Sequence, residues 1–383
     1  MFGGKEKRSR AIGAILLWLC LGAVNGGLGE TAAGSKESVS QEVQVEALLQ
    51  GMTLEEKVGQ LMWVGIEGTE ADAETLGQLR ELHAGGVVLF DRNMQNPDQV
   101  KSLIGALQKQ TLSQSPRLPL FVSVDQEGGR VLRMREQVLP LPSQEKLGLQ
   151  GSAEQVEEWA AQNARELIRM GFNVNFAPVV DIGLGAERSF ANETTEVTRL
   201  ARAAVVGFRK EGMLCTLKHF PGIGKAPKDP HQEISDITAG RDVLEQEDLA
   251  PFRSLIKDFE VQPPLIMVSH LRYPAYDAEK PACVSEFLLK GVLRRQLGFE
   301  GVVVTDDLEM GAMTSLYSFR EMGVMALAAG ADVLLVCHHA ENQKQVYAGL
   351  LEAVKEGRLS PGSLDEAVRR VLRAKLSLAL LRE

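Results

Sequence analysis

Residues 213–236 read MLCTLKHFPGIGKAPKDPHQEISD, and this stretch decides how the fold is interpreted. It opens with a short apolar run typical of a buried strand and ends that run on Lys218 and His219. A loop rich in Pro and Gly follows and carries Asp229 and His231. Polar groups at the carboxyl end of a strand leave the core and often serve as site residues. The stretch therefore predicts a strand that leads into part of an active site.

Working outward, eight short runs are apolar nearly throughout, as strands buried on both faces are. They cover residues 61–65, 86–90, 118–125, 173–181, 213–219, 264–270, 301–307 and 332–337. Amphipathic stretches separate them, and the clearest covers 153–170 between the capping residues Ser152 and Gly171. Strands alternating with helices in this number predict a single (β/α)8 TIM-type barrel. A doubly wound open sheet is the alternative, because periodicity does not show closure.

The chain has 383 residues, and its amino terminus differs in composition from the rest. Basic residues in 1–10, an uncharged apolar run and small residues after it predict an export signal over 1–27. An uncleaved amino-terminal anchor is the alternative. Residues 28–44 lack apolar periodicity and predict a flexible linker, and 45–383 form the predicted barrel domain. An exported protein, periplasmic or extracellular, is expected, with cytoplasmic or membrane-anchored location as alternatives.

The net charge of −9 argues against nucleic acid or an anionic membrane surface as a partner, since phosphate binding needs clustered Lys and Arg. Membrane contact is expected only through the amino-terminal segment, if it is uncleaved. A sugar or another neutral substrate fits better, and a monomer is expected. Cys215 and Cys337 lie in apolar runs and are predicted to be buried free thiols. His338 and His339 have no acidic or Cys partner at ligand spacing, so no metal site is predicted.

Polar residues follow several of the predicted strands, and in a barrel they would face one common mouth. These residues are Asp125, Arg130, Arg133, Asp181, Arg188, Lys218, His219, His270, Asp306 and Asp307. A single Asp in such a position is often a helix cap, but so many strand ends with polar residues predict a pocket. His270 is expected to be a hydrogen-bonded structural histidine. Lys218 is either a substrate ligand or a buried ion-pair partner.

This pocket combines a fixed carboxylate with a potential proton donor. Asp306 or Asp307 supplies the carboxylate, and His231, oriented by Asp229, supplies the proton. A carboxylate nucleophile paired with a proton donor is the arrangement that cleaves glycosidic bonds with retention. A second carboxyl group is the usual acid, so histidine in this role is unusual.

Seven segments carry a resemblance to a known family. They are MTLEEKVGQL (52–61), DQEGGRVLRM (125–134), NFAPVVDI (175–182), ERSFAN (187–192), KHFPGIGKAPKDPHQE (218–233), MVSHLRYPAY (267–276) and LRRQLGFEGVVVTDDLEM (293–310). With these segments in this order, the chain resembles glycoside hydrolase family 3. Within the family it is similar to the short, single-domain β-N-acetylglucosaminidases (β-hexosaminidases) of the peptidoglycan-recycling type.

The resemblance implies a role for each matching residue. Asp306 resembles the nucleophile that forms a covalent glycosyl-enzyme, and His231 with Asp229 resembles the acid/base dyad. Because adjacent strand residues point to opposite sides, only one of Asp306 and Asp307 is expected to face the sugar. The residues that match the family's ligands for the terminal N-acetylglucosamine are Asp125, Arg133, Arg188, Lys218 and His219. The implied substrate is an N-acetylglucosamine-containing glycan or muropeptide, with no cofactor and no metal.

The chain departs from the family pattern at two places. Ile223 stands where a histidine is usual, which is expected to alter loop contacts without loss of activity. The loop between Asp181 and Arg188 is also shorter than common. The predicted activity is that of a retaining exo-β-N-acetylglucosaminidase. A β-glucosidase or broad-specificity β-glycosidase on the same scaffold, and an inactive glycan-binding barrel, are the alternatives.

Overall fold

The computed structural model describes residues 30–150, 152–226 and 235–380, with side chains from residue 40 to residue 378. The expected export signal over 1–27 lies outside these ranges. So do Asp229 and His231, the two residues of the predicted dyad.

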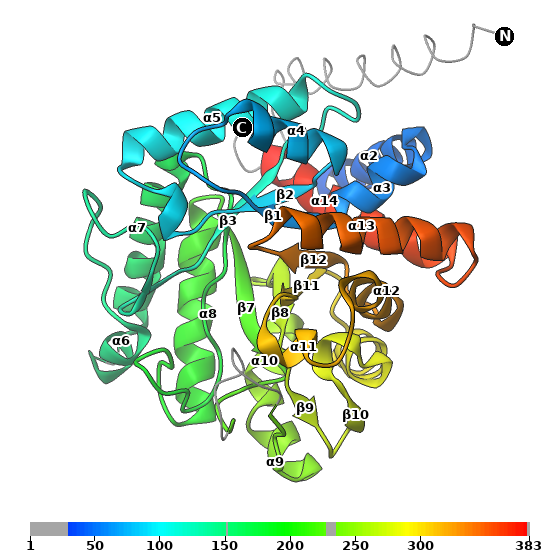
Figure 1. Cartoon of the computed structure of the whole chain (residues 1–383). Helices are drawn as coiled ribbons and strands as arrows, with labels where there is room; N and C mark the ends of the chain where they lie inside the picture. The colour runs from blue at the N-terminus through cyan, green and yellow to red at the C-terminus, as the bar shows by residue number, and fades with distance from the viewer. Residues whose placement is uncertain (1–29, 151, 227–234, 381–383) are drawn as a thin grey trace, which may run out of the picture.

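Eight parallel strands close into a barrel, and helices surround it (Figure 1). The barrel strands are β1 (Met62–Gly65), β2 (Gly86–Val88), β3 (Phe121–Val124), β6 (Val174–Asn175), β7 (Leu214–Phe220), β8 (Leu265–Val268), β11 (Val302–Asp307) and β12 (Val333–Val336). Their order around the barrel follows the chain, and β12 pairs with β1 to close it. Each of these strands lies within one of the eight predicted runs, except that β7 extends one residue beyond its run, to Phe220. The predicted (β/α)8 barrel is therefore confirmed, and the open sheet is wrong.

The helices alternate with these strands along the chain. They are α2 (Glu30–Gly51), α3 (Leu54–Gln60), α4 (Ala73–Glu81), α5 (Pro97–Leu112), α6 (Gln144–Gln150), α7 (Ala153–Met170), α8 (Thr194–Lys210), α9 (Arg241–Gln246), α10 (Leu249–Lys257), a π-helix over Phe287–Gln296, α11 (Gly311–Thr314), α12 (Phe319–Ala329), α13 (Ala340–Lys355) and α14 (Pro361–Leu380). Two small hairpins, β4–β5 (Gln126–Gly128, Val131–Leu132) and β9–β10 (Arg272–Tyr273, Asp277–Pro281), lie outside the barrel. The predicted caps of α7 are present, with Ser152 accepting from the Gln155 N–H and Gly171 in the left-handed region.

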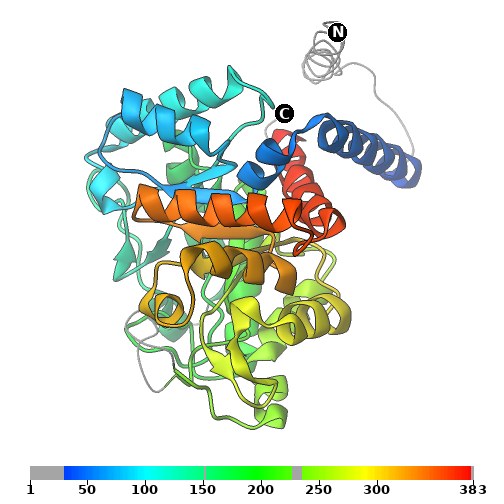
Figure 2. The same cartoon turned by 45° about the vertical axis from the view of Figure 1, so that its right-hand side comes forward.

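The amino-terminal region differs from the expected linker over 28–44, because the chain is helical from Glu30 onward. Helix α2 packs beside α14, as both views show (Figure 2). Val45 is fully buried, and an Arg373 guanidinium nitrogen lies 2.7 Å from a Glu42 carboxylate oxygen. Because these partners are far apart in sequence, a local pattern search misses the helix.

Within the described residues, no helix combines the length and apolar content needed to cross a membrane. The cysteines Cys215, Cys283 and Cys337 are buried and free, which confirms the expectation for Cys215 and Cys337.

A lysine is buried at the amino-terminal end of the barrel, away from the strand ends discussed above. The Nζ of Lys375 donates to Gln60 Oε1 at 2.7 Å and to the Gly85 carbonyl at 2.9 Å. Its side chain is 3% exposed, and no carboxylate among the described residues pairs with it. Burial lowers the pKa of Lys375 to about 7.

This burial predicts a pH-dependent stability. In the unfolded chain the pKa of a lysine is about 10.4, so between pH 7 and pH 10 the unfolded state binds the additional proton. The free energy of unfolding therefore rises with pH in this window, because removing the lysine proton on folding costs less as the pH approaches the unfolded pKa. Urea unfolding of wild type and Lys375→Met should show the wild type gaining about 2 kcal/mol relative to the variant between pH 7 and pH 9. A difference that stays constant over this range would contradict the prediction.

Candidate active site

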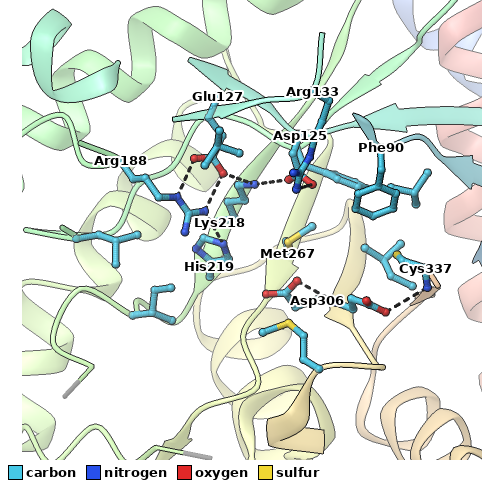
Figure 3. A pocket seen from close by; sticks show the side chains of 18 of the residues that line it. Phe90, Asp125, Glu127, Arg133, Arg188, Lys218, His219, Met267, Asp306 and Cys337 are labelled. Atoms are coloured by element: carbon cyan, nitrogen blue, oxygen red, sulfur yellow. Dashed lines mark hydrogen bonds and ion pairs between the residues drawn. The ribbon is translucent and has the colours of Figure 1, made fainter. Parts of the chain in front are cut away.

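A cavity of about 690 Å³ opens at the carboxyl ends of the barrel strands (Figure 3). The polar residues along its wall are Asp125, Glu127, Arg133, Arg188, Lys218, His219, Asp306, Asp307 and His338. The structure thus brings together Asp306 and all five residues expected to bind the sugar. Asp229 and His231 lie outside the described residues, so the position of the dyad remains a prediction.

Two acids and three basic residues form a continuous charge network on one wall of the cavity. The Nζ of Lys218, at the end of β7, lies 2.7 Å from Asp125 Oδ1 and 2.6 Å from Glu127 Oε1. Both carboxylate oxygens of Glu127 accept from Arg188, at 2.7 and 2.9 Å. A guanidinium nitrogen of Arg133 lies 3.6 Å from the second carboxylate oxygen of Asp125, Oδ2. Lys218 is therefore an ion-pair partner that also lines the cavity.

The charges of this network hold one another in the ionised state. Burial alone would raise the pKa of Glu127, but the charges of Lys218 and Arg188 outweigh it and hold that pKa well below its usual range. Burial would likewise lower the pKa values of Lys218 and Arg188. Their carboxylate neighbours raise both pKa values instead. The wall therefore presents fixed donors and acceptors at neutral pH.

His219 is oriented by a buried carboxylate behind it. Its Nδ1 lies 2.7 Å from Asp181 Oδ2, so Nδ1 carries the ring proton and donates a hydrogen bond to the Asp181 carboxylate. Its Nε2 lies 3.4 Å from an Arg188 guanidinium nitrogen and accepts from it. Asp181 also accepts from the backbone N–H groups of His219 and Ile223, the latter at 2.8 Å. Asp181 thus fixes both a cavity histidine and the loop that follows β7.

The start of that loop is held against the barrel by close contacts. The hydroxyl of Tyr273 donates to the Gly222 carbonyl at 2.8 Å, and the Nζ of Lys225 lies 2.6 Å from Asp248 Oδ2. Gly222 has a φ of 131°, and a Cβ there would lie 2.8 Å from the Asp248 Cβ, so a side chain does not fit. Ile223, the first of the two expected departures from the family pattern, is buried and lines the cavity.

Asp306 and Asp307, at the end of β11, both line the cavity. The expectation that only one of them faces the sugar stays a prediction. Both line the cavity because β11 is irregular at this point. Val304 pairs with Val333 but Asp307 pairs with Leu335, so three residue steps on β11 oppose two on β12. Such a bulge breaks the alternation of side chains and is common next to active sites.

The surroundings of Asp306 favour its ionised form. Burial would raise the pKa of this carboxyl group, but interactions with His270 and His219, the Asp307 N–H and the charge of Lys218 together hold it below its usual value. Figure 3 shows the Asp306 carboxylate pointing toward the side of the cavity that carries Lys218 and His219. A sugar in the cavity would therefore meet a carboxylate on one side and the charge network on another.

Three residues of this site were not among the expected ligands. Glu127 and Asp181 hold Lys218, Arg188 and His219 in place, and His338 lines the cavity. Glu127 could have been found from its spacing, since it lies two residues after Asp125, the last residue of the predicted strand 118–125. His338 directly follows the eighth predicted strand, where the same rule applies. Among the described residues, no cluster of His, Cys, Asp or Glu is arranged to hold a metal ion.

Comparison with known protein families yields one consistent result. The family profile described as "Glycosyl hydrolase family 3 N terminal domain" matches residues 53–374. The β-hexosaminidase of Alkalilimnicola ehrlichii is 37% identical over 295 residues, which cover 74% of this chain and 82% of that protein. The β-hexosaminidase A of Pseudoalteromonas piscicida is 34% identical over 323 residues, which cover 77% of this chain and 53% of that protein.

Comparison with solved structures gives the same result as comparison with sequences. The family 3 β-N-acetylglucosaminidase of a Paenibacillus species superposes with a TM-score of 0.83 at 38% identity, covering 87% of this chain and 64% of that one. The β-N-acetylhexosaminidase of Beutenbergia cavernae superposes with a TM-score of 0.78 at 28% identity, covering 85% of this chain and 98% of that one. The chain thus spans about half of the Pseudoalteromonas relative and nearly all of the Beutenbergia structure.

Proposed function

Because the chain belongs to glycosyl hydrolase family 3, we propose that it is a retaining exo-β-N-acetylglucosaminidase that releases terminal β-linked N-acetylglucosamine from peptidoglycan fragments. The observation that carries the proposal is the Asp306 carboxylate, which is ionised in a cavity whose opposite wall presents fixed polar groups. The β-hexosaminidase names of the relatives support the choice of sugar. The export signal expected over 1–27 is compatible with a cell-wall substrate.

In the first chemical step Asp306 attacks the anomeric carbon and forms a glycosyl ester, while the bond to the leaving oxygen breaks. His231 gives its proton to that oxygen, and Asp229 stabilises the histidine. In the second step His231 takes a proton from water, which attacks the same carbon and releases Asp306. The segment that carries both dyad residues follows Ala226, whose side chain lines the cavity, and this position supports the assignment.

Binding of the terminal sugar falls to the charge network. Asp125 accepts hydrogen bonds from sugar hydroxyls, while Arg133, Arg188, Lys218 and His219 provide donors or a fixed ring. Because these groups already hold one another in place, they need little reorganisation when the sugar binds. The absence of cofactor and metal from this scheme is part of the proposal.

The proposal is tested by nitrophenol release from the β-N-acetylglucosaminide and the β-glucoside, with wild type, His231→Ala and the control His83→Asn. The N-acetyl sugar should be turned over selectively, and His83→Asn should match wild type. His231→Ala should lose about 10²- to 10⁴-fold in kcat/KM on an unactivated disaccharide. Its loss on the nitrophenyl substrate should be smaller, because nitrophenolate leaves with little help from an acid.

Each other outcome points to a specific alternative. A preference for the glucoside would identify a β-glucosidase and contradict the choice of sugar. Binding of N-acetylglucosamine without turnover by folded wild type would identify a glycan-binding barrel. Equal losses of His231→Ala on both leaving groups would remove His231 from the role of the acid. Release of N-acetylglucosamine from chito-oligosaccharides but not from muropeptides would contradict the proposed peptidoglycan substrate.

A further inference from the structure

The bulge in β11 leaves part of the neighbouring strand without its regular backbone partners. Between Val304 and Asp307 the pairing with β12 shifts by one residue. In a regular ladder, backbone carbonyls of β11 would accept from the N–H groups of β12. Buried N–H groups without an acceptor are costly, so other acceptors must serve the end of β12.

Alternate side chains of β11 and the turn after it provide these acceptors. Thr305 Oγ1 accepts from the Leu335 N–H at 3.1 Å, and Asp307 Oδ1 accepts from the Cys337 N–H at 3.2 Å. Glu309, two residues further, accepts from the N–H groups of His338 and His339. Every second residue from 305 to 309 thus binds the end of β12 or the loop after it through its side chain. Asp306 lies between two of these attachments.

The carboxylate and the carbonyl of Asp307 are bound by other groups of the protein, and its backbone N–H binds Asp306, the proposed nucleophile. Its Oδ1 also accepts from the Glu309 N–H at 3.1 Å, and its Oδ2 lies 3.1 Å from His338 Nε2. Its carbonyl accepts from His270 Nε2 at 2.8 Å. Its own N–H donates to Asp306 Oδ1 at 2.8 Å.

The two neighbouring acids therefore differ in what they are free to do. Both carboxylate oxygens of Asp307 are occupied by groups of the protein. Asp306 accepts, from the described residues, only the Asp307 N–H, and only on Oδ1. The second oxygen of Asp306 is thus the one available to a substrate.

We propose that Thr305 and Asp307 are positioning residues, whose side chains replace strand acceptors at the bulge and thereby aim the Asp306 carboxylate at the anomeric carbon. This inference rests on the proposed function, in which Asp306 is the nucleophile. Neither residue forms or breaks a bond. Their contribution is geometric, and a displacement of a reacting group by about 1 Å can cost about 10²-fold in rate.

The test compares kcat and KM of Asp307→Ala and Asp307→Asn on the nitrophenyl N-acetylglucosaminide. Asp307→Ala should lower kcat about 10²-fold with KM nearly unchanged, because the cavity wall that binds the sugar is intact. Asp307→Asn should recover kcat to within about tenfold of wild type, because its amide oxygen can still accept from Cys337 and Glu309. Asp365→Ala, on α14 and paired with Lys57 outside the cavity, is the matched control and should behave as wild type.

A second pair of variants, at Thr305, keeps the inference testable if Asp307→Ala does not fold. Thr305 is fully buried and does not line the cavity, and Thr305→Val keeps its shape while removing the acceptor of the Leu335 N–H. This variant should lose about tenfold in kcat at unchanged KM, and Thr305→Ser should restore it. Thermal unfolding midpoints of all variants establish that folded protein is compared.

The outcomes separate this inference from the proposed function. Wild-type kcat in folded Asp307→Ala or in Thr305→Val would overturn the inference, whereas activity in Asp306→Ala would overturn the proposed function itself. Inactivity of both Asp307→Ala and Asp307→Asn would mean that Asp307 is the nucleophile. A rise in KM with unchanged kcat would mean that Asp307 binds the sugar directly. Either result would reject a positioning role.

Discussion

Asp306→Ala should lower kcat on the nitrophenyl N-acetylglucosaminide by about 10⁴-fold or more, with the fold intact. The physical reason is that no glycosyl ester can form without this carboxylate, so the two-step route is lost. Asp307 does not replace it, because both of its carboxylate oxygens are bound by Cys337, Glu309 and His338. The remaining activity would come from binding and from the proton donor alone.

Rescue and stereochemistry distinguish a lost nucleophile from a damaged cavity. Azide should restore turnover of Asp306→Ala, since it can occupy the space of the missing carboxylate and attack the anomeric carbon. The product should be the α-glycosyl azide, because a single displacement inverts the configuration, whereas wild type should release the β-anomer first. The control Asp365→Ala should show neither the loss nor the rescue. Residual kcat within about tenfold of wild type would remove Asp306 from the mechanism.

The barrel could be predicted from sequence because its strands are buried on both faces. The run 213–219 is an example, since a nearly continuous apolar stretch is what a central parallel strand requires, and β7 covers Leu214–Phe220. The predicted strand was too long where the backbone no longer forms regular hydrogen bonds with the neighbouring strands. The run 173–181 contains only β6, Val174–Asn175, followed by a single bridge between Val179 and Lys218. Apolar composition reports burial, and these residues are buried without continuous strand pairing.

The site was predicted less completely, because its geometry depends on contacts between distant residues. The position of Asp306 at a strand end was visible, but the bulge that turns both it and Asp307 toward the cavity depends on the pairing with β12. The role of Glu127 likewise depends on Arg188, 61 residues later in the chain. Spacing along one strand predicts which residues reach the mouth of a barrel. It does not predict which of them will bind one another there.

Glu127→Ala should lower the free energy of unfolding by about 3–5 kcal/mol and strongly reduce sugar binding. Glu127 is 1% exposed, and its carboxylate is shared by the buried Lys218 and the partly buried Arg188, so its removal leaves these two cations beside each other without their common partner. Glu127→Gln should be less destabilising, because its amide oxygen still accepts one N–H while the charge is lost. Glu260→Ala removes one of the two carboxylate partners of Arg202 at the surface and should change stability little, since exposed ion pairs contribute little.

The pH dependence of this loss shows whether charge or packing is responsible. The pKa of Glu127 is lower in the folded protein than in the unfolded chain, where it is about 4.3. Its stabilisation is therefore fully present above about pH 4.3 and is lost as the pH falls toward the folded value. The stability difference between wild type and Glu127→Gln should stay constant from pH 5 to pH 8 and shrink by about 1.4 kcal/mol per pH unit below pH 4. A difference that persists unchanged at pH 3 would mean that Glu127 stabilises the wall through its shape, and the fixed charges would then need another cause.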